Sequence, residues 1–137
     1  MSARAHASCV VGIEASPVVV EVHVGKGLPG MDLVGLPEAA VKESRVRVKA
    51  ALSACGYELP PRHVVLNLAP ADLRKRGATF DLAIAVALLA ANGACAPNLL
   101  DETLLCGELS LTGELRRVRG VLAQLVMARA RGLSRAI

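Results

Sequence analysis

The sequence is poor in aromatic side chains, which make up 1% of its 137 residues and include no tryptophan. Tyr57 and Phe80 are its only tyrosine and phenylalanine, so a surface that stacks successive bases on aromatic rings has little material here. The core must be built from aliphatic residues, because hydrophobic residues still make up 53% of the chain. This composition excludes a disordered chain. The length predicts one domain that spans residues 1–137.

The chain also lacks a hydrophobic run long enough for a membrane span. Its longest run, residues 82–91, is about half the length required. Its first residues lead into a β-like stretch without the apolar segment of a cleavable secretory signal. We therefore expect a soluble, cytoplasmic protein that makes no contact with a membrane.

Metal-binding patterns are missing too. No two of the four cysteines have CxxC spacing, so the sequence does not indicate a zinc site. No HExxH sequence or carboxylate cluster suggests a catalytic metal. We expect no metal in this domain, and we interpret the cysteines as buried structural thiols of a reducing compartment: Cys9, Cys55, Cys95 and Cys106.

A phosphate loop for nucleotide binding is likewise absent. That loop needs Gly-x4-Gly-Lys-Ser/Thr, and Gly25-Lys26-Gly27 has neither the earlier glycine nor the hydroxyl residue. These glycines, with Gly30, are interpreted as loop residues, and we expect no cofactor in this domain. A Gly-x-Ser-x-Gly nucleophile elbow is missing as well. The histidines are predicted to be exposed strand residues: His6, His23 and His63.

What the sequence does contain is a clear pattern of strands in its first half. Valine occupies every second position of residues 18–24, which predicts a strand with one buried face. Residues 4–14 resemble a second strand, and Ser16-Pro17 is predicted to separate the two as an antiparallel pair. Short strands are expected over residues 31–34 and 63–68.

Three helices are predicted. The first follows Gly35-Leu36-Pro37, with Pro37 in its first turn and Gly56 after its end. The second covers residues 80–92, with Thr79 as N-cap and Asp81 complementing the helix dipole. It is apolar all round, which is typical of a helix buried on several sides. The third covers residues 121–131.

The C-terminal third is predicted to form a hairpin before its helix. Residues 104–111 resemble a strand, Thr112-Gly113 a tight turn, and residues 114–118 the returning strand. Residues 133–137 begin another apolar segment that resembles the start of a strand. We therefore expect the chain to be a fragment of a longer protein.

Basic residues are the remaining candidates for function, since the formal net charge is +4. Two clusters fall in predicted loops, where they could follow a phosphate backbone. The alternative is that they are solvated loop charges. The tentative nucleic-acid-binding residues are Arg74, Lys75, Arg76, Arg116, Arg117 and Arg119. The charged residues of the first helix, Lys42, Arg45, Arg47 and Lys49 with Glu43, are interpreted as an ordinary solvated face.

Four segments, in this order, resemble the N-terminal domain of the ComM/YifB proteins, which are magnesium-chelatase (ChlI)-like AAA+ ATPases. They are Val34-Gly35-Leu36-Pro37-Glu38, Lys42-Glu43-Ser44-Arg45, Asn67-Leu68-Ala69-Pro70-Ala71-Asp72-Leu73 and Gly107-Glu108-Leu109-Ser110-Leu111-Thr112-Gly113-Glu114. The resemblance implies an α/β (α+β) domain similar to the Lon protease domain and to the C-terminal domain of RadA, with a mixed sheet and packed helices. It also implies a downstream AAA+ module that uses ATP and magnesium, assembly into a hexameric ring, and work on DNA.

The resemblance to Lon raises the question of peptidase activity. Lon proteins place a nucleophilic serine where this chain has Thr79 and a lysine base where it has Leu122. A Ser/Lys dyad needs an amine beside the hydroxyl, and leucine cannot supply it. We therefore expect no catalytic residue in this domain, although Asp72, Asp81 and Glu108 would lie near the Lon-like groove.

Two functions stay open at this point. In the first, the domain is a non-catalytic module of a ComM-like motor that contacts DNA or helps to form the ring. In the second, the parent is a true magnesium-chelatase-type ATPase, and the domain binds a protein partner.

Overall fold

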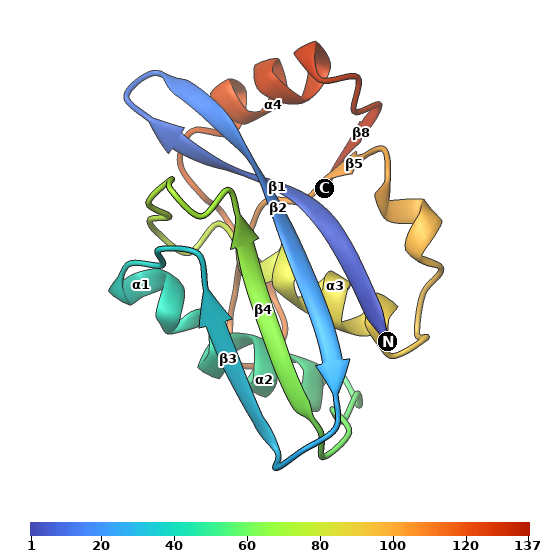
Figure 1. Cartoon of the computed structure of the whole chain (residues 1–137). Helices are drawn as coiled ribbons and strands as arrows, with labels where there is room; N and C mark the ends of the chain where they lie inside the picture. Colours follow the sequence, from blue (N-terminus) through green and yellow to red (C-terminus); the bar gives the residue numbers. More distant parts are fainter.

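The alternating valines form the central hairpin of the protein. The structure, a computed structural model, describes all residues from 1 to 137 (Figure 1). Strand β1 (Ser2–Val11) runs antiparallel to β2 (Glu14–Gly25) along its whole length. Val18, Val20, Val22 and Val24 are each at most 3% exposed, as the period of two requires. The predicted antiparallel pair is confirmed.

The position predicted for the turn of this hairpin is wrong. The chain turns at Gly12 and Ile13, and Gly12 adopts a φ of +64°. Pro17 lies inside β2, opposite Ser8. The neighbouring strand β4 (His63–Ala69) pairs with β2 only from Val19 onward. A proline is tolerated because this part of β2 has a partner strand on one side only.

Six strands form one mixed sheet in the order β3-β4-β2-β1-β5-β8. Strand β3 (Gly30–Val34) is parallel to β4, while β5 (Thr103–Leu104) is parallel to both β1 and β8 (Arg135–Ala136). A separate two-stranded sheet pairs β6 (Glu108–Leu109) with β7 (Leu115–Arg116). The predicted mixed sheet with packed helices is confirmed, and the fold is α+β.

Helices α2 (Ser44–Ala54) and α3 (Asp81–Ala91) cover one face of this sheet (Figure 1). The inward side chains of β1, β2 and β4 share one hydrophobic cluster with both helices. Ala83 and Ala87 of α3 are fully buried, as are Ile84 and Leu88. The small alanines allow the backbones to approach closely, and the all-apolar sequence of α3 is explained by its burial on several sides.

Helix α4 (Val121–Ala130) packs on the opposite face, at the hairpin end of β1 and β2. Ser8 points away from the main core, because its neighbours Ala7 and Cys9 point into it. The Ser8 hydroxyl donates a hydrogen bond of 2.7 Å to Gln124 Oε1 of α4, and both residues are buried. This bond joins α4 to the sheet.

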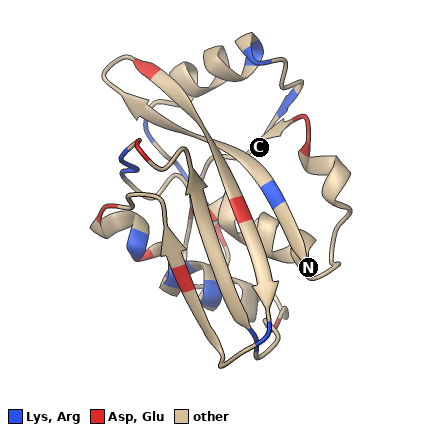
Figure 2. Cartoon of the chain, in the orientation of Figure 1, with Lys and Arg blue, Asp and Glu red and all other residues tan.

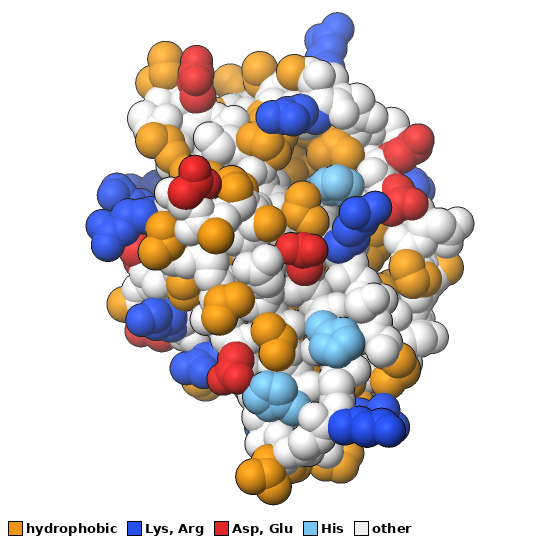
Figure 3. Space-filling view, viewed as in Figure 1, with side chains coloured by type: hydrophobic (Ala, Val, Ile, Leu, Met, Phe, Trp, Pro, Cys, Tyr) orange, Lys and Arg blue, Asp and Glu red, His pale blue; other side chains and the backbone are white.

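The rest of this second face is open to solvent. Glu21 and His23 are exposed on it, while His6 and His63 are half-buried on the same side of their strands. Figure 3 views this face and shows histidine side chains spread over it. No helix of the structure has both the length and the apolar character needed to cross a membrane.

The first predicted helix is two helices. Helix α1 (Ala39–Lys42) ends at Glu43, which is at the same time the N-cap of α2. Pro37 precedes the first helical turn instead of belonging to it. It forms an isolated parallel β-bridge with Lys75. Gly56 does follow the end of α2 with φ +83°, as predicted.

Two further predictions in the second half are wrong. Thr79 does not cap α3: its Oγ1 is buried and makes no hydrogen bond, and Phe80 occupies the N-cap. The strand predicted over residues 104–111 is divided between β5 and β6. At the division, the amide of Gly107 donates to Thr79 O, and the amide of Leu82 donates to Gly107 O. These bonds fix residue 107 against the start of α3, outside either ladder.

The cysteines are all free thiols, but they are not all buried. Cys9 is 1% exposed and belongs to the core. Cys55 is exposed at the end of α2, and Cys95 and Cys106 are partly exposed. Burial raises the pKa of the Cys106 thiol. The prediction of buried thiols therefore holds fully for Cys9 alone.

Candidate functional site

A buried carboxylate lies at the junction of α2, α3 and β6. Asp81, at the first turn of α3, is fully buried. Its Oδ1 accepts a hydrogen bond of 2.5 Å from the Ser44 hydroxyl, and its Oδ2 accepts one of 3.0 Å from the Leu109 amide. Arg47 donates to both oxygens, at 2.7 Å from Nε and 3.1 Å from Nη2.

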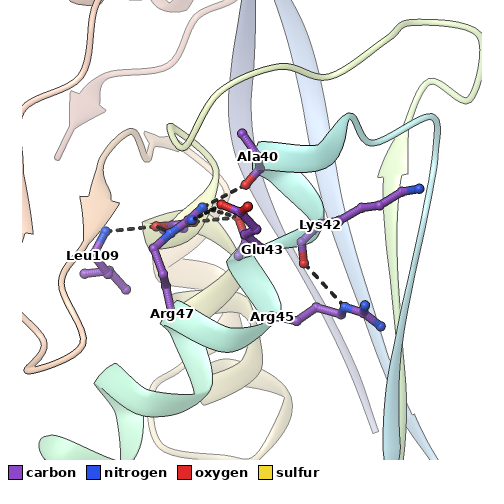
Figure 4. Close-up of polar contacts among 8 residues, drawn as sticks. Ala40, Lys42, Glu43, Arg45, Arg47 and Leu109 are labelled. Atoms are coloured by element: carbon purple, nitrogen blue, oxygen red, sulfur yellow. Dashed lines mark hydrogen bonds and ion pairs between the residues drawn. The ribbon is translucent and has the colours of Figure 1, made fainter.

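Arg47 is held from several sides (Figure 4). Its guanidinium also donates to the carbonyl oxygen of Ala40 at 2.9 Å and lies 3.4 Å from the Glu43 carboxylate. The hydrogen bond to Asp81 raises the pKa of Arg47. The interpretation of Arg47 as part of a solvated face is therefore wrong. Since four donors occupy the Asp81 oxygens, this carboxylate fixes three elements and has no free lone pair directed at a substrate.

The residues at the Lon-like positions are not arranged as a dyad. Thr79 Oγ1 has no hydrogen-bond partner, so no base contacts it. Leu122 is 76% exposed on α4. Glu108 is half-buried on β6, and Asp72 is exposed in the loop after β4. The structure does not bring Asp72, Asp81 and Glu108 together by any hydrogen bond.

The glycines of residues 25–30 connect two strands, β2 and β3. A phosphate loop would instead lead into a helix, whose first N–H groups bind the anion. The interpretation as loop glycines holds for Gly27 alone, because Gly25 ends β2 and Gly30 begins β3. Of the histidines, only His63 has an acidic partner, Asp32, at 3.1 Å between Nε2 and Oδ2. No group of three His, Cys, Asp or Glu side chains could hold a metal ion.

The first basic cluster lies in the loop beyond the end of β4. Figure 2 shows the Lys and Arg residues of this loop in blue. This loop is fixed by its main chain: the Lys75 amide donates to Leu36 O, and the Glu38 amide donates to Lys75 O, at 3.1 and 3.0 Å. Arg74 and Arg76 are exposed, and Arg76 pairs with Glu38 at 3.2 Å. The loop therefore presents two arginines on a fixed backbone.

Lys75 does not share their exposure. Its side chain is fully buried, and Nζ donates a hydrogen bond to the carbonyl oxygen of Pro70. Burial lowers the pKa of Lys75. A different lysine, Lys42 of α1, lines a surface hollow together with Arg74. The sequence assigned Lys42 to a solvated helix face, and no local signal connects it to a loop more than thirty residues away.

The second cluster is exposed throughout. Arg116 ends β7, and Arg117 and Arg119 occupy the segment that leads into α4. This segment touches β1, because a Cβ atom added to Gly120 would lie 2.6 Å from Val10 Cγ2. The first cluster touches the adjacent residue, since Cys9 Sγ donates to Arg74 O at 3.5 Å. Both basic loops therefore meet the same end of β1.

The sequence of this α+β domain matches a known protein family. The model of the family described as "Subunit ChlI of Mg-chelatase" matches residues 20–137. The chain therefore belongs to this family and is a ComM/YifB-type, magnesium-chelatase-like domain.

Individual relatives support the same assignment. The chain is 51% identical to the uncharacterized protein YifB of Escherichia coli (strain K12) over 90% of its length and 24% of YifB. It is 45% identical to the uncharacterized protein Rv2897c of Mycobacterium tuberculosis (strain H37Rv) over 94% of its length and 26% of that protein. It is 44% identical to the competence protein ComM of Haemophilus influenzae over 86% of its length and 23% of ComM. The chain thus spans about a quarter of the length of these relatives.

Proposed function

We propose that this chain is a non-catalytic module of a ComM-like, magnesium-chelatase-related AAA+ ATPase, and that it contacts DNA through its exposed arginines. The observation that carries the proposal is that both basic loops lie against the same end of β1, one at Cys9 and the other at Val10. Lys and Arg contacts to phosphates dominate sequence-independent affinity for DNA. The name of the relative from Haemophilus influenzae, a competence protein, agrees with a role in DNA processing.

The parent protein would supply the rest of the machinery. ATP and magnesium would bind to a separate AAA+ module, and ring assembly, as a hexamer, would bring several copies of this domain around the same nucleic acid. Recombination, including branch migration, is the class of reaction that such a DNA motor would serve. The described domain would position DNA and would leave the use of ATP to the motor.

The test is a fluorescence-anisotropy titration of the chain with single-stranded, duplex and branched DNA at two salt concentrations. Binding that weakens steeply with salt supports the proposal. A variant with alanine at the five exposed arginines of the two loops should lose this binding: Arg74, Arg76, Arg116, Arg117 and Arg119. The matched control places alanine at five exposed cations elsewhere and should keep the binding: Arg4, Lys26, Arg129, Arg131 and Arg135. Absence of binding at low salt would refute an autonomous DNA site.

The competing function is that of a protein-binding module in a true magnesium-chelatase-type ATPase. It is favoured by the description of the matching family as a subunit of magnesium chelatase. Co-purification of the parent with a partner that carries a von Willebrand-type metal-binding module, together with no DNA binding, would support this function instead.

A further inference from the structure

A groove lies along the outer edge of β3, on the side of the sheet that α2 covers. Strand β3 pairs with β4 on one edge and has no partner on the other. Beside the free edge, α2 and the loop before β4 enclose a groove of about 790 Å³. Its apolar wall includes Met31 of β3, Val46 of α2 and Leu59 of the loop. Val46 is 68% exposed, although it lies on a helix that packs on the core.

All charged residues that line this groove are positive. They are Arg45 and Lys49 of α2 and Arg62 of the loop before β4, and no acidic residue joins them. Lys49 and Arg62 take part in no ion pair. Figure 4 shows that Arg45 extends to the opposite side of α2 from Arg47, and its Nη1 donates to Met31 O of β3 at 3.1 Å. The charges are therefore directed at the groove and are not neutralised within the chain.

The strand edge is only partly protected against pairing, because Arg45 occupies one main-chain acceptor of β3, Met31 O. Edge strands are usually protected by lysine, proline or a bulge, and residues 30–34 contain neither lysine nor proline. They pair with β4 in an uninterrupted register. A peptide that added a strand there would make main-chain hydrogen bonds to β3. Its alternate side chains would enter the groove, since successive side chains of a strand point to opposite faces.

We propose that the β3 edge and this groove bind an extended peptide segment of a partner protein, in which acidic residues occur among apolar ones. The apolar side chains would pack against Met31, Val46 and Leu59, and the acidic ones would pair with Arg45, Lys49 and Arg62. Nucleic acid fits less well, because no aromatic ring lines the groove. None of the five exposed arginines of the proposed DNA contact lines it, so this inference stands or fails independently of that function.

The experiment is a selection of random dodecapeptides displayed on phage against the purified chain, followed by synthesis of the strongest binder. We expect the selected peptides to be enriched in Asp and Glu that alternate with aliphatic residues. Binding of the synthetic peptide should weaken about tenfold when Lys49→Glu and Arg62→Glu are combined. The matched control, Arg129→Glu with Arg131→Glu, applies the same charge change at exposed positions near the end of α4 and should leave the affinity unchanged.

A second readout separates docking at the edge from attraction by charge alone. Bound peptide should slow the exchange of backbone amide hydrogens in residues 30–34, whereas peptide held elsewhere should not. Thermal unfolding of both variants checks that they remain folded. The proposal is overturned if no acidic peptides are enriched, if the groove variant binds them as well as the control does, or if β3 gains no protection. It is also overturned if oligothymidylate binds the groove with the same dependence on Lys49 and Arg62, because the site would then be one for nucleic acid.

Discussion

The guanidinium of Arg47 donates two hydrogen bonds to the carboxylate of Asp81, across 34 positions of sequence. The carboxylate is fully buried, and the Arg47 side chain is 17% exposed. Because Ser44 and the Leu109 amide complete the set of donors, one carboxyl group connects α2, α3 and β6. Breaking such a pair leaves a charge in the interior without its partner.

Replacing Asp81 with asparagine should therefore destabilise the fold. An amide removes the negative charge and places N–H donors where four donors already point. We expect a loss of about 3 kcal/mol in the free energy of unfolding, measured by urea denaturation. Glu43→Gln is the control, because Glu43 is 69% exposed and its pair with Arg47 is a surface contact. That variant should lose about 0.5 kcal/mol or less. Equal losses in the two variants would contradict a structural role for the buried pair.

Gly35 is the second position where a small change should have a large effect. It adopts a φ of +107°, and a Cβ there would overlap the carbonyl oxygen of Leu68 and lie 2.9 Å from its carbonyl carbon. These are backbone atoms of β4, which cannot move without disturbing the sheet. Gly35→Ala should cost about 3 kcal/mol in thermal or urea unfolding.

Gly12 supplies the comparison for Gly35. It also has a positive φ, +64°, but no atom lies within 4 Å of its added Cβ. Gly12→Ala should therefore show only the backbone cost of a left-handed residue, about 1 kcal/mol. If both substitutions cost the same, then steric overlap with β4 is not what requires glycine at position 35.

Lys75 should make stability depend on pH in the alkaline range. Burial lowers its pKa below the ordinary value of 10.5, so the folded protein releases the proton at a lower pH than the unfolded chain does. In the pH window between the lowered pKa of the folded state and the ordinary pKa of the unfolded chain, unfolding takes up a proton. The free energy of unfolding therefore rises as the pH increases toward 10.5. Below the window, the cost of burying the ammonium group is present in full.

Lys75→Met tests this dependence, because methionine fills a similar volume without a charge. We expect the unfolding free energy of the variant, relative to the native chain, to be most favourable near neutral pH and to decline as the pH approaches 10. Urea denaturation at a series of pH values measures the difference. A constant difference across that range would show that Lys75 has the same pKa in the folded and unfolded states.

Short-range patterns predicted the elements whose signal is complete within a few residues. The alternation of residues 18–24 gave the buried face of β2, and the apolar run of residues 82–91 gave α3 within one residue of its bounds. The bounds of the two hairpin strands differ from the predicted ones by up to four residues. The break predicted at Ser16-Pro17 is wrong, although a proline usually interrupts a strand. A proline interrupts a strand only where its missing N–H would have bonded to a neighbouring strand. Strand β4 pairs with β2 only from Val19 onward, so Pro17 has no partner on that side.

The side chains of the site were harder to predict, since their roles depend on partners that are distant in sequence. Arg47 and Lys75 lie beside other basic residues in the sequence, and charged residues of this kind are usually exposed to solvent. Arg47 is instead paired with Asp81, and Lys75 is buried with Pro70 O as its acceptor. Thr79 is of a residue type that is favoured at helix N-caps. The structure nevertheless places its hydroxyl in the interior without a hydrogen-bond partner. Only the tertiary contacts distinguish these cases.

The burial of Lys75 leads to a prediction for DNA binding that sequence alone would not make. If the domain follows a phosphate backbone, each exposed cation that contacts a phosphate contributes about one unit to the slope of log affinity against log salt concentration. Arg74→Ala and Arg76→Ala should each reduce that slope by about one. Lys75→Met should leave the slope unchanged, because its ammonium group is buried against Pro70 O.

Anisotropy titrations over a series of salt concentrations measure these slopes for the native chain and the three single variants. Arg4→Ala, on the other end of β1, is the control and should behave as the native chain does. A reduced slope in Lys75→Met would mean that the lysine leaves its buried position when DNA binds, since a buried ammonium group cannot release a counterion from the phosphates. Equal slopes in all variants would mean that this loop does not touch DNA, and the contact would then have to be sought in the segment from Arg116 to Arg119.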